Sequence, residues 1–434
     1  MTRERLILFT RFPLAGRAKT RLIPRFGPDG AAELQREMTE HVLARLWPVL
    51  RRRGVALEVR FEGGSEADMR RWLGHGLRFA PQGNGDLGAR MSRAMTEAFA
   101  KGARAVVIVG ADCPGLDAGV VERALDAVRA HRVVFGPARD GGYYLVGLDA
   151  PLPSLFEGMA WSTDRVLAAS TARAREMALE PFLLPELSDV DEPADLAVWE
   201  KARRASRTVS IIIPTLNEAA HLPVTLKHAA DSQPAEIIVA DGGSHDDTVR
   251  IAESGGATLV RSASGRARQM NAGAAAARGE TLLFLHAGTL LPANGCEVVI
   301  EAFRRARVVG GAFKLGIRDP FPGRWLVEAT TNLRSRLRRL PYGDQALFVR
   351  RWAFDELGGF PDLPILEDYE FVRRLRSLGQ LALLDAAVLT SGRRWQRLGL
   401  LRTTLINKLI ILRYRCGVSP IELAACYRRG SSPL

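Results

Sequence analysis

The chain has 434 residues, of which 47% are hydrophobic and 25% charged, and its formal net charge is +13. This length and composition predict a soluble globular protein of two or three domains and argue against a disordered or fibrous chain. No run of about 18 apolar residues occurs, so we expect no membrane-spanning helix. The apolar stretch in MTRERLILFTRF (1–12) is too short for a signal peptide. The four cysteines are scattered and form no CxxC pair, which indicates reduced thiols in a cytoplasmic protein.

The first predicted strand, Leu6 to Thr10, runs directly into the loop RFPLAGRAKTRL (11–22). A glycine-containing loop after a first strand, with Lys19 and Arg21 behind it, suits phosphate binding by backbone N–H groups and cations. The GxxxxGK[ST] spacing of a Walker A motif is absent, so the loop alone is weak evidence.

Two distant carboxylates belong to the same predicted domain. Asp112 follows a predicted strand at 106–109, and Asp191 lies in SDVDEPADL (188–196), just ahead of a predicted helix. If they converge beside a phosphate-binding loop, they would hold Mg²⁺ between triphosphate oxygens. The alternatives are a turn residue for Asp112 and a helix N-cap for Asp191.

With these motifs, residues 1–200 resemble a family of uncharacterised GT-A-like transferases related to the molybdenum-cofactor and phospholactate nucleotidyltransferases. The resemblance implies that Lys19 contacts phosphate and that Asp112 and Asp191 bind Mg²⁺ or Mn²⁺. It also implies a nucleotide pocket formed with the help of Gly85, Asp86 and Gly88. The motifs that carry it are PLAGRAKTRL (13–22), GNGDLGARM (83–91), GADCPGL (110–116), DGGYYLVGL (140–148) and DVDEPADL (189–196).

Residues 200–208, EKARRASRT, are charged and lack apolar periodicity, so they predict a linker. We expect the domain boundary close to Ser206, with one domain at 1–205 and a second at 206–434. The second domain would end in a basic tail at 396–434.

The most informative stretch of the chain opens this second domain. A β-branched run at 209–213 ends in Pro-Thr-Leu-Asn-Glu, and a second run at 236–240 ends in Asp-Gly-Gly-Ser. Two buried parallel strands with polar residues at their carboxyl ends form the crevice where open α/β sheets bind ligands. The alternative is an ordinary βαβ unit with a turn. Four residues are expected to frame the nucleoside, although the last could equally be a helix cap: Asn217, Glu218, Asp241 and Asp246. Pro214 and Gly243 are further candidates for nucleotide binding.

This stretch resembles family 2 glycosyltransferases, which have the GT-A fold, and in particular the arsenosugar-biosynthesis (selenodomain-associated) type. The resemblance continues through 265–280, 282–292, 343–351 and 357–375, and covers essentially all of 208–434. The fold class it implies is α/β, with two GT-A-like, mostly parallel sheets in tandem.

One departure from the family pattern concerns the metal site. Family 2 enzymes usually bind Mg²⁺ or Mn²⁺ through an Asp-x-Asp element after a central strand, whereas here the strand at 281–285 is followed by His286-Ala-Gly288. A glycine has no side chain to coordinate a metal. Three interpretations are open. His286 could bind metal together with Asp241, Arg266 and Arg268 could neutralise the diphosphate without metal, or the domain could be catalytically impaired.

The proposed base lies in LPILEDYEFVRRLR (363–376). By resemblance, Asp368 accepts the proton of the acceptor hydroxyl and Glu367 orients it. The alternative is a pair of acids favoured by the dipole at a helix start. Residues expected on the acceptor side, where Gly311 could instead be a packing glycine and Trp395 a packed surface residue, are Gly311, Asp344, Gln345, Arg394 and Trp395.

Residues 392–434 contain nine Lys and Arg against the single Glu422. Within them, LGLLRTTLINKLIILRYR (398–415) puts leucines 398, 401, 405, 409 and 412 on one helical stripe. Such a basic helix either packs on the catalytic domain or lies on an anionic membrane surface. No nucleic-acid-binding motif accompanies the charge.

These observations predict a two-domain transferase. The C-terminal domain would transfer a glycosyl group from a nucleotide-sugar to an unknown small-molecule or lipid acceptor. The N-terminal domain would bind or form a nucleotide-activated substrate from a nucleoside triphosphate, which would make the chain bifunctional. The competing hypotheses are a catalytically impaired nucleotide-binding scaffold and a peripheral glycosyltransferase at the inner face of the membrane with a lipid-like acceptor.

Overall fold

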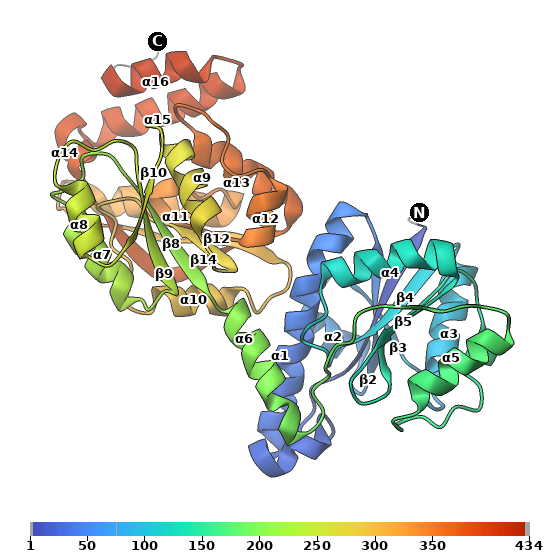
Figure 1. Ribbon diagram of the computed structural model, residues 1–434. Coiled ribbons are helices and arrows are strands. Elements are labelled where there is room, and N and C mark those ends of the chain that lie inside the picture. The colour runs from blue at the N-terminus through green and yellow to red at the C-terminus, as the bar shows by residue number, and fades with distance from the viewer. Residues whose placement is uncertain (1–2, 75, 430–434) are drawn as a thin grey trace. The chain divides into compact units, whose positions relative to one another are not determined.

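The computed structural model describes residues 3–74 and 76–429, apart from the side chains of residues 394, 401, 428 and 429. The chain divides between Arg204 and Ala205 into two compact units. Each unit is an α/β domain with a seven-stranded, mostly parallel sheet covered by helices (Figure 1). The expected fold class, two GT-A-like domains in tandem, is therefore confirmed.

The N-terminal sheet has the order β3-β2-β1-β4-β6-β5-β7, and β6 is antiparallel to both of its neighbours. Its strands are β1 (Glu4–Arg11), β2 (Ala56–Glu62), β3 (Arg78–Pro81), β4 (Ala105–Gly110), β5 (Val133–Pro137), β6 (Tyr143–Leu148) and β7 (Phe182–Leu183). Its helices are α1 (Ile23–Arg52), α2 (Glu66–Leu73), α3 (Leu87–Ala100), α4 (Ala118–His131), α5 (Val166–Glu176) and α6 (Leu196–Ser206).

The C-terminal sheet has the order β10-β9-β8-β11-β13-β12-β14, with β13 antiparallel. Its strands are β8 (Val209–Thr215), β9 (Glu236–Asp241), β10 (Thr258–Arg261), β11 (Thr281–Phe284), β12 (Val308–Ile317), β13 (Leu347–Arg350) and β14 (Gln380–Thr390). Its helices are α7 (Leu222–Asp231), α8 (Thr248–Ser254), α9 (Arg266–Ala276), α10 (Gly295–Ala302), α11 (Arg324–Arg338), α12 (Arg351–Glu356), α13 (Glu367–Leu378), α14 (Arg393–Leu398), α15 (Leu400–Arg415) and α16 (Pro420–Arg429).

The two sheets share one topology. Adding seven to each strand number of the first sheet gives the order of the second, including the antiparallel sixth strand. Loops that follow corresponding strands therefore meet at corresponding edges of the two sheets, where open α/β sheets bind their ligands. The structure thus contains two versions of one binding architecture.

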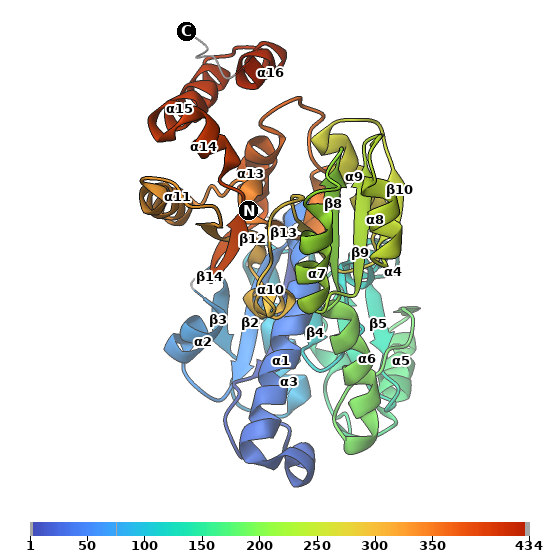
Figure 2. The same cartoon turned by 90° about the vertical axis from the view of Figure 1, so that its left-hand side faces the viewer.

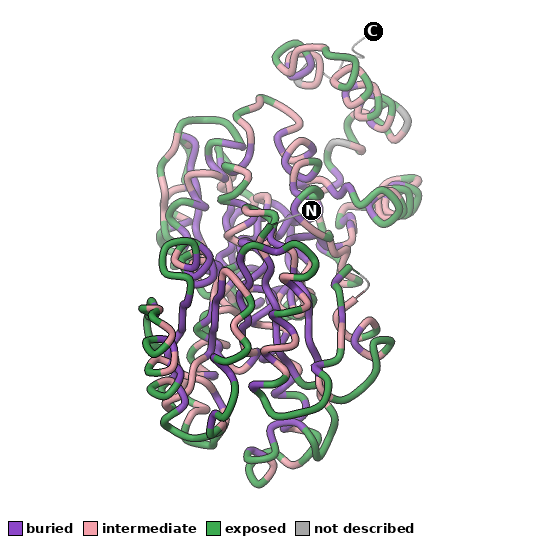
Figure 3. The backbone as a smooth tube through the Cα atoms, turned by 90° about the vertical axis from the view of Figure 1, so that its right-hand side faces the viewer, coloured by how far each residue is buried: buried purple, intermediate pink, exposed green. Residues whose placement is uncertain are grey.

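The central strands are buried on both faces, as Figure 3 shows for the backbone. In β8, Ile211 and Ile213 pack in one core cluster with Leu222 and Leu226 of α7. On the other face, Phe284 of β11 lies in an aromatic cluster with Phe354, Phe360 and Phe371. Such continuous apolar strands require helices on both sides, which explains the β-branched runs in the sequence.

The linker prediction at 200–208 is corrected by the structure. Residues up to Ser206 continue helix α6, which is anchored upstream by the buried Trp199 against Leu22, Leu34 and Met38. The apolar residues of this helix precede the charged window, so the window itself shows no periodicity.

The tail packs on its domain through a different face from the expected leucine stripe. Ile406 and Ile410 of α15 are buried with Leu423 of α16, whereas Leu405 and Leu412 are exposed. No described helix is long and apolar enough to cross a membrane.

Candidate functional site

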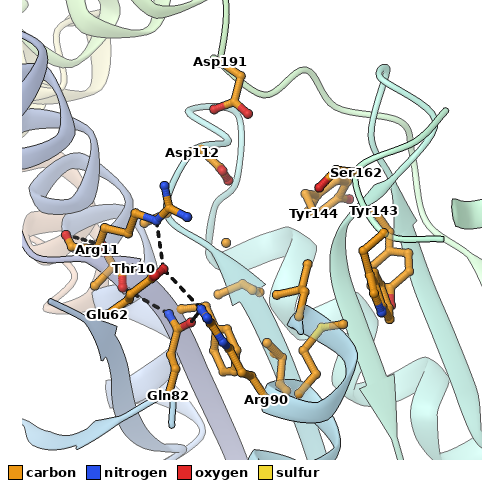
Figure 4. A pocket seen from close by; sticks show the side chains of 18 of the residues that line it. Thr10, Arg11, Glu62, Gln82, Arg90, Asp112, Tyr143, Tyr144, Ser162 and Asp191 are labelled. Carbon is orange, nitrogen blue, oxygen red and sulfur yellow. Dashed lines mark hydrogen bonds and ion pairs between the residues drawn. The ribbon is translucent and has the colours of Figure 1, made fainter. Parts of the chain in front are cut away.

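The N-terminal domain contains a cavity of about 730 Å³ at the carboxyl ends of β1 and β4 (Figure 4). The loop after β1, the end of β2, the start of α3 and the strand β6 enclose it. Predicted residues that line it are Lys19, Arg21, Asp86, Asp112 and Asp191. The sequence motifs, which lie more than 170 residues apart at the extremes, therefore meet in one place.

Lys19 lies between the two predicted metal carboxylates. Its Nζ is 2.6 Å from Asp191 Oδ1 and 3.9 Å from Asp112 Oδ2, and it donates to the carbonyl of Val190 at 2.6 Å. The ammonium is buried, and the backbone of Lys19 has a φ of +45°, a strained value for a residue with a side chain. Burial alone would raise the pKa of Asp191, but Lys19 and Arg21 lower it below its usual range.

Two of the predicted metal ligands meet at this point, but no group of three or more His, Cys, Asp and Glu side chains in the described part of the chain is arranged to hold a metal ion, so Mg²⁺ binding here stays a prediction. Asp112 and Asp191 reach the same ammonium, so both carboxylates converge on one positive charge. A divalent ion held there would take its remaining ligands from a triphosphate and would neutralise it.

A polar wall of the cavity was missed by the sequence analysis. Arg11 Nε donates to Glu62 at 2.9 Å, Arg90 Nη1 lies 3.2 Å from the same carboxylate, and Gln82 Nε2 donates to the carbonyl of Thr10 at 3.1 Å (Figure 4). Burial would raise the pKa of Glu62, but Arg11 and Arg90 lower it. Arg11 could have been predicted from the sequence, because it directly follows the first predicted strand.

An aromatic wall faces these polar groups. Tyr143 and Tyr144 come from β6, and Trp161 meets Tyr143 edge-on with ring centroids 6.3 Å apart. Figure 4 shows both tyrosines and Ser162 on the opposite side of the cavity from Gln82 and Thr10. A cavity with one cationic and one aromatic side has groups for both the phosphates and the base of a nucleotide.

The predicted glycine turn shapes the start of α3. Asp86 caps the helix by accepting the N–H of Ala89 at 2.8 Å. Gly85 has a φ of +100°, and a Cβ on Gly88 would lie 2.5 Å from the carbonyl oxygen of Phe156. Both glycines are therefore required by backbone geometry, and Asp86 is the member of this group that lines the cavity.

In the C-terminal domain, Asp241 organises the turn after β9. Its buried carboxylate accepts the N–H groups of Gly243 and Ser244 at 3.0 Å each, and the hydroxyls of Ser244 at 2.5 Å and Thr215 at 3.3 Å. Burial opposes ionisation, but these hydrogen bonds lower the pKa of Asp241. The carboxylate fixes the glycine turn, and its predicted contact with a nucleoside stays a prediction.

The loop after β8 is tied to the same turn. Asn217 donates its N–H to Ser244 Oγ and accepts from the N–H of His245, both at 2.9 Å. Asp246 accepts the N–H of Ala219 at 3.1 Å and that of Thr248 at 3.0 Å, so it caps the start of α8 as well. Two loops that follow neighbouring strands thus form one rigid rim. Pro214 lies at the end of β8 beside this rim.

The predicted base lies at the start of α13. Asp368 Oδ2 accepts the N–H of Gly343 at 2.6 Å, and Arg266 Nη1 donates to Glu367 Oε1 at 3.2 Å. Burial and then Asp368 raise the pKa of Glu367, against the effect of Arg266. A Cβ on Gly343 would lie 3.1 Å from both Asp368 Oδ2 and His286 Nε2, so the imidazole and the base flank one glycine.

His286 is a neutral imidazole, which is the form that binds metals, but it has no group of partner ligands among the described residues. Burial and the nearby Arg266 lower the pKa of His286 to about 3, so the imidazole is neutral at physiological pH. Among the described residues, no group of three or more His, Cys, Asp and Glu side chains is arranged to hold a metal ion. The single carboxylate of Asp241 is already hydrogen-bonded by its own turn and by Thr215 of β8.

Gly288 lies near His221 and Arg393, and the carboxylate of Glu218 interacts with both of these residues. A Cβ built on this residue would lie 3.8 Å from His221 Cβ and 4.0 Å from Arg393 Nη2, so a cation lies beside the position where the family pattern led us to expect an aspartate. The backbone φ of Gly288 is +92°. Arg393 is exposed and donates to Ser391 Oγ at 3.1 Å. Burial raises the pKa of Glu218, and the positive charge of Arg393 acts against that shift. The residues here do not fit a divalent metal.

Several predicted acceptor residues have structural roles. Gly311 is a packing glycine inside the sheet, because a Cβ there would lie 2.0 Å from the carbonyl oxygen of Ala382. Gln345 is fully buried and donates to the carbonyl of Phe313 at 3.0 Å. Trp395 stacks on Phe321 and is partly buried, and the side chain of Arg394 lies outside the described residues. Gly311 and Gln345 thus have packing roles in the fold, and their predicted contacts with an acceptor stay predictions.

The predicted role of Arg268 as a phosphate cation is weakened, because the structure pairs this residue with Asp362. Their closest N–O distance is 2.8 Å at the exposed surface. Arg393, which the sequence analysis did not single out, is the cation beside Gly288.

Comparisons with known proteins assign both halves to families. Residues 46–163 match the family described as "Uncharacterized protein conserved in bacteria (DUF2064)", and residues 210–357 match glycosyl transferase family 2. No curated protein matches the chain. The protein thus joins an N-terminal DUF2064 domain to a C-terminal glycosyltransferase family 2 domain.

Solved structures similar to the chain each cover about half of it. A protein from Desulfovibrio desulfuricans G20, provisionally assigned as a nucleotide-diphospho-sugar transferase, is 34% identical over 48% of this chain and 90% of its own, with a TM-score of 0.44. Glucosyl-3-phosphoglycerate synthase from Mycobacterium tuberculosis, solved with Mn²⁺, UDP and glucosyl-3-phosphoglycerate, is 21% identical over 50% of this chain and 82% of its own, with a TM-score of 0.39. TarS 1–349 from S. aureus, solved with UDP-GlcNAc, is 19% identical over 43% of this chain and 59% of its own, with a TM-score of 0.34.

The buried ion pair of Lys19 yields a stability prediction. We expect Asp191→Asn to lower the free energy of unfolding of the N-terminal domain by roughly 1–3 kcal/mol, because the buried ammonium loses its nearest charge partner. Urea unfolding followed by tryptophan fluorescence measures the change. The matched control is Glu192→Gln, which removes a neighbouring but exposed pair with Arg21. Equal effects of the two substitutions would contradict this account of Lys19.

Asp344 yields a prediction for the pH dependence of stability. Its Oδ1 is buried without a hydrogen-bond partner, and burial raises the pKa of Asp344 to about 6. The folded chain therefore binds this proton more tightly than the unfolded chain, and stability contributed by Asp344 falls as pH rises from about 4 to about 6. We expect Asp344→Asn to stabilise the C-terminal domain by roughly 1–3 kcal/mol at pH 8 and to have little effect below pH 4. Urea unfolding of both proteins at the two pH values tests this prediction. A gain in the free energy of unfolding that does not depend on pH would refute it.

Proposed function

We propose that the C-terminal domain transfers a glycosyl group from a nucleotide-sugar to an acceptor hydroxyl, with Asp368 as the general base. The observation that carries the proposal is the position of Asp368, which is held by the N–H of Gly343 beside His286. The match to glycosyl transferase family 2 supports the reaction class. The acceptor is left open.

The proposed chemistry assigns a role to each member of this cluster. Asp368 would take the proton of the acceptor hydroxyl as that oxygen attacks the anomeric carbon of the sugar. Glu367 is held by Arg266 and would fix the start of α13, which positions the base. His286 is neutral and lies on the other side of Gly343, where it lends a hydrogen-bonding group without adding positive charge near the base.

We further propose that Arg393 and His221 balance the charge of the leaving diphosphate in place of a metal ion. Three observations support this. Gly288 offers no ligand, Arg393 Nη2 lies 4.0 Å from the position of a Cβ on Gly288, and no metal-binding cluster is found among the described residues. A guanidinium has the planar geometry to bind phosphate oxygens in pairs.

For the N-terminal domain, we propose binding of a nucleotide through its phosphates in the cavity between Lys19 and Tyr143. Support comes from the cationic wall of Arg11 and Arg90 opposite the aromatic wall, and from the two carboxylates that converge on Lys19. This geometry supports nucleotide binding, which is the first step of the predicted nucleotidyl transfer. Release of pyrophosphate from a nucleoside triphosphate and a sugar phosphate would extend the proposal to catalysis.

The role of the base is tested by Asp368→Asn in the full chain. We expect transfer or hydrolysis of nucleotide-sugars to fall by roughly 10²–10⁴-fold, because general base catalysis contributes about that much. Donor binding, measured by calorimetry with UDP-sugars and GDP-sugars, should remain. If the wild-type protein binds nucleotide-sugars but neither transfers nor hydrolyses any of a broad panel, the scaffold hypothesis is favoured. If it binds none of them, the glycosyltransferase proposal fails.

The metal-independent handling of the diphosphate is tested by Arg393→Ala. We expect nucleotide diphosphate affinity to fall by roughly 10–100-fold, since a charged hydrogen bond is worth about 1.5–3 kcal/mol. The matched control is Arg397→Ala on the same short helix, which should bind like the wild type. EDTA should leave the affinity of the wild-type C-terminal domain unchanged. Loss of binding in EDTA together with normal binding by Arg393→Ala would overturn the proposal.

Nucleotide binding by the N-terminal domain is tested by Arg90→Ala. We expect affinity for nucleoside triphosphates to drop about tenfold or more, because Arg90 supplies one of the charges in the cavity. Arg139→Ala, at an exposed position outside the cavity, is the control. Titrations with the full chain and Mg²⁺ measure both, and equal affinities of the two variants would refute the assignment of this cavity.

A further inference from the structure

Helix α11 presents most of its large apolar residues to solvent, although Val327 is buried against β12, and it turns two polar side chains toward the protein. Asn332 accepts the N–H of Leu315 at 2.8 Å and donates to its carbonyl at 3.0 Å, and Glu328 accepts the N–H of Ile317 at 2.8 Å. The polar face of the helix therefore binds the backbone of β12. This orientation is the reverse of that of an ordinary surface helix.

The outward face of α11 is a continuous apolar stripe. Trp325, Leu333 and Leu337 are separated by multiples of four residues, so they lie along one side of the helix, and they are 70%, 57% and 73% exposed. Leu326 beside them is also exposed. Exposed apolar side chains that form a row mark an interaction surface, whereas single ones do not.

Basic residues border this stripe. Arg336, Arg338 and Arg339 are exposed, and no ion pair of theirs occurs in the part of the chain that the structure describes. Tryptophan and leucine on one side of a helix with arginines along its border are the pattern of helices that lie in the plane of an anionic lipid surface.

Helix α15 extends the same surface. Its outward residues alternate between basic and apolar ones, namely Arg402, Leu405, Lys408 and Leu412. The beginnings of α11 and α15 are joined by one cluster in which Val327 packs near Leu400. Figure 2 shows α11 on the same flank of the C-terminal domain as α14, α15 and α16, away from α7 and α8.

We propose that the outward faces of α11 and α15 form a docking surface for anionic membrane lipids. Charge complementarity favours anionic lipids, because residues 392–434 carry nine basic residues against one acidic residue. The end of α11 adds further arginines. The leucines and Trp325 stand out from a helix, so they suit insertion between lipid headgroups.

This surface adjoins the acceptor side of the proposed active site. The inner face of α11 contacts this region through Ser335, whose hydroxyl donates to Gln345 at 2.8 Å, and through Arg334, whose guanidinium lies 3.7 Å from the ring centroid of Tyr342. Gly343, whose N–H donates to Asp368, directly follows Tyr342 in the chain. Docking through α11 therefore brings the lipid–water interface next to the base, and an acceptor with a lipid anchor could enter from there.

The test is flotation of the full chain with vesicles of phosphatidylcholine alone or mixed with phosphatidylglycerol. We expect flotation with the anionic vesicles only, weakened by high salt. The triple variant Trp325→Ser, Leu333→Ser, Leu337→Ser should bind roughly tenfold or more weakly, because three apolar side chains no longer leave water. The matched control is Leu183→Ser with Val224→Ser, two substitutions at exposed apolar positions that belong to neither of these helices.

A second variant separates charge from apolar contact. Arg336→Gln, Arg338→Gln, Arg339→Gln should lower binding to anionic vesicles by a similar factor while the apolar stripe stays intact. Circular dichroism shows whether each variant is folded, and flotation requires no turnover, so it is independent of the proposed reaction. Wild-type protein that fails to float with anionic vesicles, or a triple variant that floats like the wild type, would overturn the proposal. So would a dimer in sedimentation that the triple variant converts to monomers without any lipid binding, because a second copy would then cover the stripe.

Discussion

The buried carboxylate of Asp241 is the constraint on which the C-terminal site depends. It ends β9 in a buried position, and four donors from β8 and from its own turn keep it ionised. Through Ser244 the same turn holds the N–H of Asn217 in the preceding loop. A donor molecule therefore meets a rim that is already in place, so little ordering entropy opposes its binding.

The two domains share one topology, but their corresponding loops carry different charged residues. In the N-terminal domain the loop after β4 supplies a carboxylate, and a buried ammonium from the loop after β1 compensates it. In the C-terminal domain the loop after β11 supplies a glycine, and an arginine from a helix far along the chain lies beside it. The sheet order determines where a ligand can bind, and the loops determine which charges it meets.

Much of the fold could be predicted because it depends on local sequence. The apolar runs at β1, β4, β8 and β9 each end in polar residues, and the structure places strands there with the expected limits to within about two residues. The amphipathic pattern after Glu367 likewise correctly predicts α13 and its buried Phe371 and Val372.

The site could be predicted only in part, since its remaining features depend on long-range packing. Lys19 shows the difference. Its position after the first strand marked it for phosphate, but its burial between Asp112 and Asp191 depends on a contact across more than 170 residues. Gly311 and Gln345 lie in motifs that look exposed in sequence and are enclosed by β14 and Phe313 in the fold. Arg393 had no motif of its own, because its place beside Gly288 is set by where the tail returns to the domain.

The conformation of Gly288 limits which residues this position can accept. With a φ of +92°, its backbone is one that an aspartate would adopt only under strain, and an arginine stands next to the space that the new side chain would occupy. A single codon change would thus produce a strained acid paired with a guanidinium, which is neither a metal ligand nor a free cation. We therefore expect an acid at this position to be tolerated only together with a change at Arg393.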